Sequence, residues 1–340
     1  MDLGRNILRR NAMILVLVTA LVLMSGCGGK QSAPEKSEYG KQLSGICDYI
    51  DETMEGWYRA GESGSDWCVI LYSKDGRDFD YDGYLEEMGR YITKKYAEDG
   101  RLDPVKATEW HHAALAVKAC GGDPTNIGED KNGDPVNLIA DGIYDWKVTD
   151  DLASQGSNAL IYALITLDEC EAEVPKGSKY TRAKIVDKLL KYQTKDGGFS
   201  LDEHGKGSTD ITAMAVQALA PYYEKNVRVQ ESVDTALAFL SGEQQDSGMY
   251  LYGDGYSSET ISQVIMALCA LGRDPEEDEE FIKSGGSLVD ALMAFRMDNG
   301  SFSHEFPDDT SAEGDNLMSS QQAGQAFAAL VELEKEQKDE

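Results

Sequence analysis

The chain has 340 residues, of which 41% are hydrophobic and 27% are charged, a composition typical of a globular protein. Its 61 acidic residues outnumber the 32 basic ones and give a formal net charge of -29 at pH 7. This charge argues against nucleic acid as a partner, because DNA and RNA phosphates are bound by basic surfaces. Glycine fills 34 positions and proline only 8, so the glycines serve specific turns and not a low-complexity linker.

The N-terminal segment has the features of a secretion signal. Arg5, Arg9 and Arg10 precede an apolar run over residues 12–24, which is shorter than the ~20 residues that a membrane-spanning helix needs. The run ends in Leu-Met-Ser-Gly followed by Cys27, which resembles the lipobox of bacterial lipoproteins. The resemblance implies that residues 1–26 are removed and that Cys27 is lipidated.

Lipidation at Cys27 would anchor the protein on the extracellular face of the bacterial cell membrane. The polar residues that follow predict a flexible tether over residues 27–40. Five cysteines then remain, at positions 47, 68, 120, 170 and 269. Their odd number and irregular spacing indicate neither a disulfide framework nor a zinc site, and at most two disulfides can form within one chain.

Two interleaved repeats run through the rest of the chain. The first consists of small and apolar residues that follow a capping hydroxyl residue, a pattern typical of buried helices. It recurs at residues 108–117, 154–164, 208–219, 257–268 and 319–330. The second consists of amphipathic helical segments that end in turns such as Asp-Gly-Gly-Phe at 196–199. In these turns we expect glycine in a left-handed conformation, with the following apolar residue packed back onto the helices.

The two repeats together predict an all-α domain over residues 41–333, followed by a charged tail at 334–340. Inner helices are expected near 66–74, 104–120, 152–168, 208–224, 257–272 and 317–333. Outer helices are expected near 43–59, 83–97, 134–145, 179–194, 228–242 and 278–296. Six such pairs are enough to close a ring.

The segment around residues 193–223 resembles the terpenoid cyclase and protein prenyltransferase superfamily, which has an α/α toroid fold. It reads Gln-Thr-Lys-Asp-Gly-Gly-Phe at 193–199 and Thr-Asp-Ile-Thr-Ala-Met-Ala-Val-Gln-Ala-Leu at 209–219. The likeness is nearest to prenyltransferase-repeat domains of cell-surface proteins in Gram-positive bacteria. The cobalamin carriers intrinsic factor and transcobalamin are more distant. The resemblance implies a toroid of six inner and six outer helices, but it implies little about function.

Three catalytic signatures of proteins with this barrel can be tested on the sequence. The chain has no Asp-x-Asp-Asp acid of the squalene-type cyclases. The zinc set of protein prenyltransferases is incomplete, because the segment 253–258 has no Cys and the helix after Asn316 begins without a His. Residues 241–244 read Ser-Gly-Glu-Gln where thioester proteins have Cys-Gly-Glu-Gln, which we interpret as coincidence.

The remaining motifs favour packing over chemistry. Asp78, Asp80 and Asp82 match the start of an EF-hand loop, but its final Glu is absent, so calcium is a weak alternative. The adjacent pair His111 and His112 must point to different faces of a helix, and packing is favoured over a place in the pocket. We expect no cofactor.

The N-terminal ends of the inner helices should gather at one mouth of the ring. This predicts a ligand-binding set of polar and aromatic residues: Gln155, Asp210, Tyr250, Tyr252, Tyr256, Glu259, Phe302, Met318, Gln321 and Gln322. Such a lining suits a small molecule or peptide that is bound without catalysis. Two alternatives stay open. One is an enzyme acting on an isoprenoid or related apolar substrate, with Asp210 or Glu259 as the acid, and the other is a scaffold for cell-surface proteins.

Overall fold

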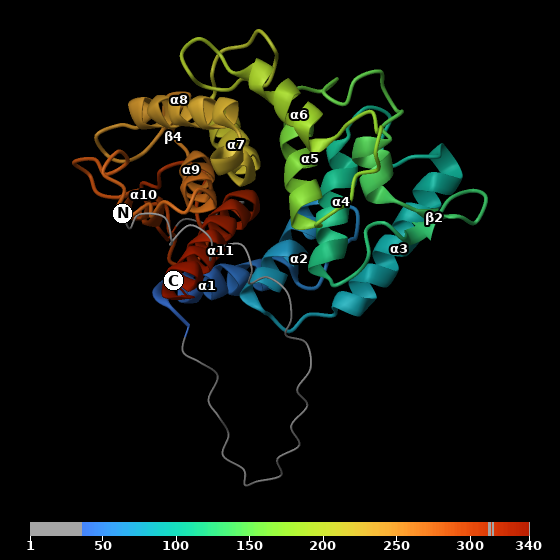
Figure 1. Ribbon diagram of the computed structural model, residues 1–340. Helices are drawn as coiled ribbons and strands as arrows, with labels where there is room; N and C mark the ends of the chain where they lie inside the picture. Colours follow the sequence, from blue (N-terminus) through green and yellow to red (C-terminus); the bar gives the residue numbers. More distant parts are fainter. Residues whose placement is uncertain (1–35, 312–313, 315, 340) are drawn as a thin grey trace, which may run out of the picture. The chain divides into compact units, whose positions relative to one another are not determined.

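The computed structural model describes residues 36–311, 314 and 316–339. These residues form one compact unit, and it is all-α apart from two short hairpins (Figure 1). The predicted signal and Cys27 lie outside the described residues.

Six inner helices contact one another in a closed cycle, in the order α2, α4, α5, α7, α9, α11 and back to α2. Their bounds are α2 (Ser63–Asp75), α4 (Thr108–Ala119), α5 (Asn158–Glu169), α7 (Thr209–Leu219), α9 (Ser258–Ala270) and α11 (Leu317–Asp339). Each overlaps one of the six predicted inner segments. The α/α toroid predicted from the repeats is confirmed.

The outer layer packs against the inner ring. It consists of α1 (Glu38–Met54), α3 (Tyr81–Asp99), the π-helical turn η1 (Ala140–Tyr144), α6 (Arg182–Leu189), α8 (Val227–Glu243) and α10 (Leu288–Met293). In this layer α1 contacts α2, α6 contacts α5, α8 contacts α7 and α10 contacts α9. Both α3 and η1 contact α4. Two short 3-10 helices, η2 (Leu190–Tyr192) and η3 (Ala220–Lys225), extend α6 and α7.

The third outer element differs from the helix predicted over 134–145. A hairpin of β1 (Ile127–Glu129) and β2 (Pro135–Val136) precedes the helical turn, and its second strand occupies the first residues of the predicted helix. The Asp130 carboxylate accepts hydrogen bonds from the Asn132 and Asp134 amides, and Gly133 adopts a positive φ of 82°, so these residues form a hairpin turn and helical structure begins only after it. A second hairpin, β3 (Leu251–Tyr252) with β4 (Gly255–Tyr256), precedes α9.

The first and last helices extend into the segments expected to be the tether and the tail. Helix α1 begins at Glu38, inside the predicted tether, because the Ser37 side chain accepts a hydrogen bond from the Gly40 amide and caps the helix. Helix α11 continues through the predicted tail, whose Glu, Lys and Gln residues are strong helix formers.

Hydroxyl residues at the starts of inner helices join the two layers. Ser208 and Ser257 cap α7 and α9, and their side chains accept hydrogen bonds from Ile211 and Thr260 amides. The glycines in the turns before these helices, such as Gly197 with a φ of 94°, have the predicted left-handed conformation. The Phe199 amide then donates to the Thr212 hydroxyl at 2.7 Å, which fixes the turn against α7.

Candidate ligand-binding site

Two adjoining cavities lie along the axis of the inner ring. The amino-end cavity, at the first turns of α2, α7, α9 and α11, has a volume of about 570 Å³. The carboxyl-end cavity, at the last turns of α2, α4, α5 and α9, has a volume of about 490 Å³. Both are lined in part by Trp67, Tyr162, Met214, Gln263 and Gln325, which therefore form a waist between them.

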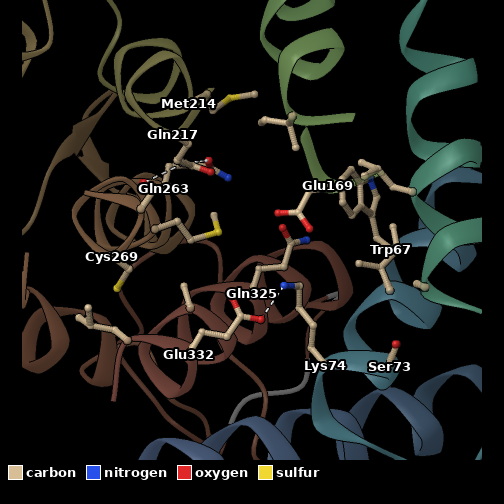
Figure 2. Close-up of a pocket in the computed structure, with 18 of the residues that line it drawn as sticks. Trp67, Ser73, Lys74, Glu169, Met214, Gln217, Gln263, Cys269, Gln325 and Glu332 are labelled. Carbon is tan, nitrogen blue, oxygen red and sulfur yellow. Dashed lines mark hydrogen bonds and ion pairs between the residues drawn. The ribbon is translucent and has the colours of Figure 1, made fainter. Parts of the chain in front are cut away.

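One side of the waist is a row of hydrogen-bonded glutamines from three consecutive helices. The Gln217 amide on α7 donates to Gln263 Oε1 on α9 at 2.9 Å, and the Gln263 amide donates to Gln322 Oε1 on α11 at 2.9 Å. Gln325 points into the same space (Figure 2). Gln322 and Gln325 both line the amino-end cavity. Among the described residues, Gln322 Nε2 and the Gln325 side-chain amide have no hydrogen-bond partner, so they are free to bond a ligand.

The opposite side of the waist is aromatic. The rings of Trp67 on α2 and Tyr162 on α5 lie 5.9 Å apart between centroids and are tilted by 51°. Leu115 and Ile165 continue this apolar wall in the carboxyl-end cavity. The waist can therefore contact a ligand with polar groups on one side and ring faces on the other.

A carboxylate held by a histidine lies at the amino-end cavity. Glu259, in the first turn of α9, is 7% exposed and receives a hydrogen bond from Ser257 Oγ at 2.9 Å. His304 Nδ1 lies 2.8 Å from Glu259 Oε2, which orients the imidazole. The Tyr252 ring packs edge-on against that imidazole with centroids 5.4 Å apart.

Asp210, in the first turn of α7, is the second carboxyl group of this cavity. Its Oδ1 is buried and has no hydrogen-bond partner among the described residues. Burial raises the pKa of Asp210, and the Glu259 charge raises it further, while a hydrogen bond from Thr260 and the proximity of His304 oppose the rise. Asp210 thus places a carboxyl group at the cavity, with one of its oxygens, Oδ1, packed away from solvent and without a donor.

The carboxyl-end cavity has a different polar character. Lys74 on α2 forms an ion pair with Glu332 on α11 at 2.9 Å, and Figure 2 shows both side chains near Gln325. Lys118 and Glu169 also line this end. Charges of both signs therefore surround this mouth.

Six of the ten predicted binding residues line the amino-end cavity: Asp210, Tyr252, Glu259, Met318, Gln321 and Gln322. Gln321 is also fixed to α2, where its amide donates to the Gly64 carbonyl at 2.7 Å. The structure thus brings together the residues from the first turns of α7, α9 and α11. Their role in binding stays a prediction.

The other four predicted residues lie elsewhere. Tyr250 and Phe302 are fully buried in the hydrophobic core, where the Phe302 ring packs 5.7 Å from that of Phe327. Tyr256 is half-buried on β4 against the same core. Gln155 is exposed before α5, and its amide contacts the neighbouring Ser154 carbonyl.

Sequence reasoning missed the residues of the waist. Trp67, Tyr162 and Met214 look like core residues in helices that are apolar nearly all round. The glutamines had a signal: Gln217, Gln263 and Gln325 are large polar residues within helical runs that consist mostly of small and apolar residues.

In the described part of the chain, no three His, Cys, Asp or Glu side chains lie close enough together to bind a metal ion. Asp80 instead caps α3, accepting from the Gly83 amide at 2.9 Å. The five cysteines of this part are free thiols.

His111 and His112 lie in the core and line neither cavity. His111 contacts the Gly142 carbonyl at 3.0 Å, and His112 contacts Asp66 Oδ2 at 2.7 Å.

Within the described residues, no helix is both long and apolar enough to cross a membrane.

Comparison with solved structures identifies proteins of similar architecture. The type II terpene cyclase MstE from Scytonema, in complex with the product merosterolic acid A, superposes with a TM-score of 0.54 at 12% identity, covering 87% of this chain and 99% of that chain. Candida albicans protein geranylgeranyltransferase-I, complexed with GGPP, superposes with a TM-score of 0.55 at 11% identity, covering 85% and 91%. No curated protein sequence matches the chain.

A family model, the A-macroglobulin TED domain, matches residues 162–264. This range includes the Ser-Gly-Glu-Gln segment at the end of α8. There, Ser241 Oγ donates to the Glu280 carbonyl at 2.6 Å, and the buried Gln244 amide donates to the Gly248 and Phe281 carbonyls, both at 3.0 Å. The two side chains fasten α8 to the following loops.

The closed inner ring, the outer layer and the solved structures agree on the architecture. The chain has an α/α toroid fold, similar to the folds of this terpene cyclase and this protein geranylgeranyltransferase.

Proposed function

We propose that this chain is a lipid-anchored protein of the bacterial cell surface whose toroid binds a small molecule or peptide without transforming it. The observation that carries the proposal is the hollow ring centre, with cavities of about 570 and 490 Å³ that meet at the waist. Both volumes fall in the range of roughly 300–1,000 Å³ that is typical of small-ligand pockets. A scaffold with no ligand would have side chains filling this space.

The lining supports binding more than catalysis. Ring faces of Trp67 and Tyr162 lie opposite the glutamine row, so a ligand can be oriented by contacts on both sides. The sequence lacks the Asp-x-Asp-Asp acid, and Glu259 is already engaged by Ser257 and His304.

Native mass spectrometry of the intact protein, extracted from its host in mild detergent, tests the binding proposal. We expect a non-covalent mass that is released on unfolding. The variant Met214→Trp, which places a larger side chain at the waist, should lose this mass and remain folded by circular dichroism. A wild-type protein that carries no retained mass and is stabilised by no compound from a metabolite extract would contradict the proposal.

Asp210 favours one alternative, an enzyme acting on an isoprenoid or related apolar substrate. Its raised pKa keeps the carboxyl group closer to its protonated form, as an acid catalyst requires. Incubation with squalene and with geranylgeranyl diphosphate, followed by product analysis, separates the two functions. Turnover that Asp210→Asn abolishes would replace the binding proposal by this one.

Surface anchoring is tested at Cys27. We expect Cys27→Ser to remove the lipid mass and to shift the protein from the membrane fraction to the medium. Cys170→Ser, which changes a half-buried thiol of the toroid, is the matched control and should leave the protein in the membrane fraction. A Cys27→Ser protein that stays membrane-bound would argue against the lipid anchor.

A further inference from the structure

The charge of the amino-end cavity restricts the ligands that it can bind. Among the described residues that line it, the ionisable ones are Asp210, Glu259, Tyr252, Tyr162 and His304, with no Lys or Arg. A phosphate or carboxylate ligand would therefore meet two carboxyl groups and find no ammonium or guanidinium partner. Anionic ligands are disfavoured here.

A cationic ligand is also a poor match. The Glu259 carboxylate already has His304 and Ser257 as partners. Asp210, the carboxyl group without a partner on Oδ1, lies where burial favours its neutral form.

A neutral ligand rich in hydroxyl groups satisfies the same residues. We propose that the amino-end cavity binds a saccharide, with a hydroxyl group bonded to the Asp210 carboxyl group and further hydroxyls bonded to the amides of Gln322 and Gln325. A hydroxyl group both donates and accepts, as does a side-chain amide, so the two form pairs without a charge. This inference rests on the proposed binding function and names the class of ligand.

The aromatic residues complete the fit. Trp67, Tyr162 and Tyr252 line the cavity, and the flat faces of such rings can cover the C–H face of a sugar ring. Polar groups at the edge of the sugar and C–H groups on its face thus find partners in one cavity. A purely apolar ligand would cover the Asp210 carboxyl group and the glutamine amides without offering them a hydrogen-bond partner, which is costly.

Tryptophan fluorescence reports on this cavity. Of the four tryptophans, Trp67 lines the cavity, Trp57 is 69% exposed, and Trp110 and Trp146 are each 1% exposed. The full-length protein is titrated with glucose, galactose, N-acetylglucosamine and linear trisaccharides of each. Glucuronate and glucosamine serve as the charged counterparts of glucose, and farnesol is the apolar probe.

We expect a saturable change in emission with at least one neutral saccharide, and about tenfold weaker binding by its anionic counterpart. Asp210→Leu removes the acceptor and should weaken saccharide binding by about tenfold or more. Asp82→Leu changes an exposed acid in the first turn of α3 and should leave binding unchanged. Circular dichroism of each variant verifies that the fold is retained.

Three outcomes would overturn the saccharide inference. If only farnesol, a cation or an anion binds, the ligand class is wrong while the proposed binding function stands. If a saccharide binds equally well to Asp210→Leu, the site is placed wrongly. If no probe binds and native mass spectrometry finds no retained mass, the inference fails together with the proposed function.

Discussion

His111 and His112, which are adjacent on α4, have very different pKa values. Burial lowers the pKa of His111 to about 4, and only the Gly142 carbonyl opposes this. Burial also disfavours the charge of His112, but hydrogen bonds and charges from Asp66 and Glu109 outweigh it and raise the pKa of His112 to about 9. Both histidines are packed in the core as predicted, but His112 also belongs to a buried charged cluster with Asp66 and Glu109.

Stability should fall at both ends of the pH range because of this pair. The His112 contribution is complete below its unfolded pKa of about 6.5 and is lost as pH rises through about 9. The His111 contribution has the opposite sign: it is complete above about 6.5 and is lost as pH falls towards about 4. Urea unfolding across this range should therefore show maximal stability near pH 6.5, with a decline as pH rises towards about 9 and another as it falls towards about 4.

His112→Leu tests the alkaline side. The substitution leaves Asp66 buried without its cationic partner, so we expect a loss of about 3–5 kcal/mol near pH 7. The alkaline decline in stability should also flatten. His204→Gln, at an exposed loop position, is the control and should change neither quantity. An unaltered alkaline decline in His112→Leu would show that another group titrates there.

The free thiols should be unreactive in the folded protein. Burial raises the pKa of Cys68 and Cys170 to about 11, and that of Cys47, Cys120 and Cys269 to about 12, so little reactive thiolate exists near neutral pH. Maleimide labelling of the Cys27→Ser protein should be slow when folded and should reach five groups in urea. Cys170, which is only half-buried, should react first. Fewer than five groups after unfolding without reductant would indicate a disulfide.

At the scale of elements, the closing seam of the ring depends on Gly324 of α11. A Cβ there would lie 2.5 Å from Leu71 on α2 and 3.3 Å from Ile46 on α1. The absence of a side chain lets the last inner helix approach the first pair closely. An added methyl group at this seam should therefore interfere with closure of the ring.

Gly324→Ala should destabilise the protein by about 1–3 kcal/mol through overpacking. Gly45→Ala, in α1, is the matched control, because a Cβ there meets nothing within 4 Å. It should be neutral or stabilise by up to about 1 kcal/mol, since alanine favours a helix more than glycine does. Equal effects of the two changes in thermal unfolding would mean that the seam tolerates a looser contact.

The repeats predicted the helices well, because a buried helix needs a run of small and apolar residues that sequence displays directly. They were wrong at residues 134–136, where the second strand of a hairpin takes the place of the predicted start of a helix. The site was less accessible than the fold. Residues in first turns, such as Asp210 and Glu259, could be placed at one mouth by the parallel order of the helices. The position of the Trp67 side chain at the cavity could not be inferred, because the sequence of a helix that is apolar on all sides does not show which side borders a cavity.

At the scale of the whole molecule, closure makes the toroid differ from an open solenoid. In an open array the terminal repeats have one neighbour each, and stability is nearly a sum of local terms. Here α11 contacts both α9 and α2, so every inner helix has two inner neighbours. Loss of packing in one half of the ring should therefore be transmitted to the other half from both directions.

Phe302→Ala can reveal this coupling, because all four tryptophans lie at residues 57–146 and report on the first half of the ring, while Phe302 lies in the second. Phe302 is fully buried, so its truncation should cost about 3–5 kcal/mol. If the ring unfolds as one unit, tryptophan fluorescence and far-ultraviolet circular dichroism should shift together to lower urea concentration. Val227→Ala, at a position that is 68% exposed, should shift neither curve. A fluorescence transition that stays at its wild-type midpoint while circular dichroism shifts would show that the halves unfold independently, as in an open array.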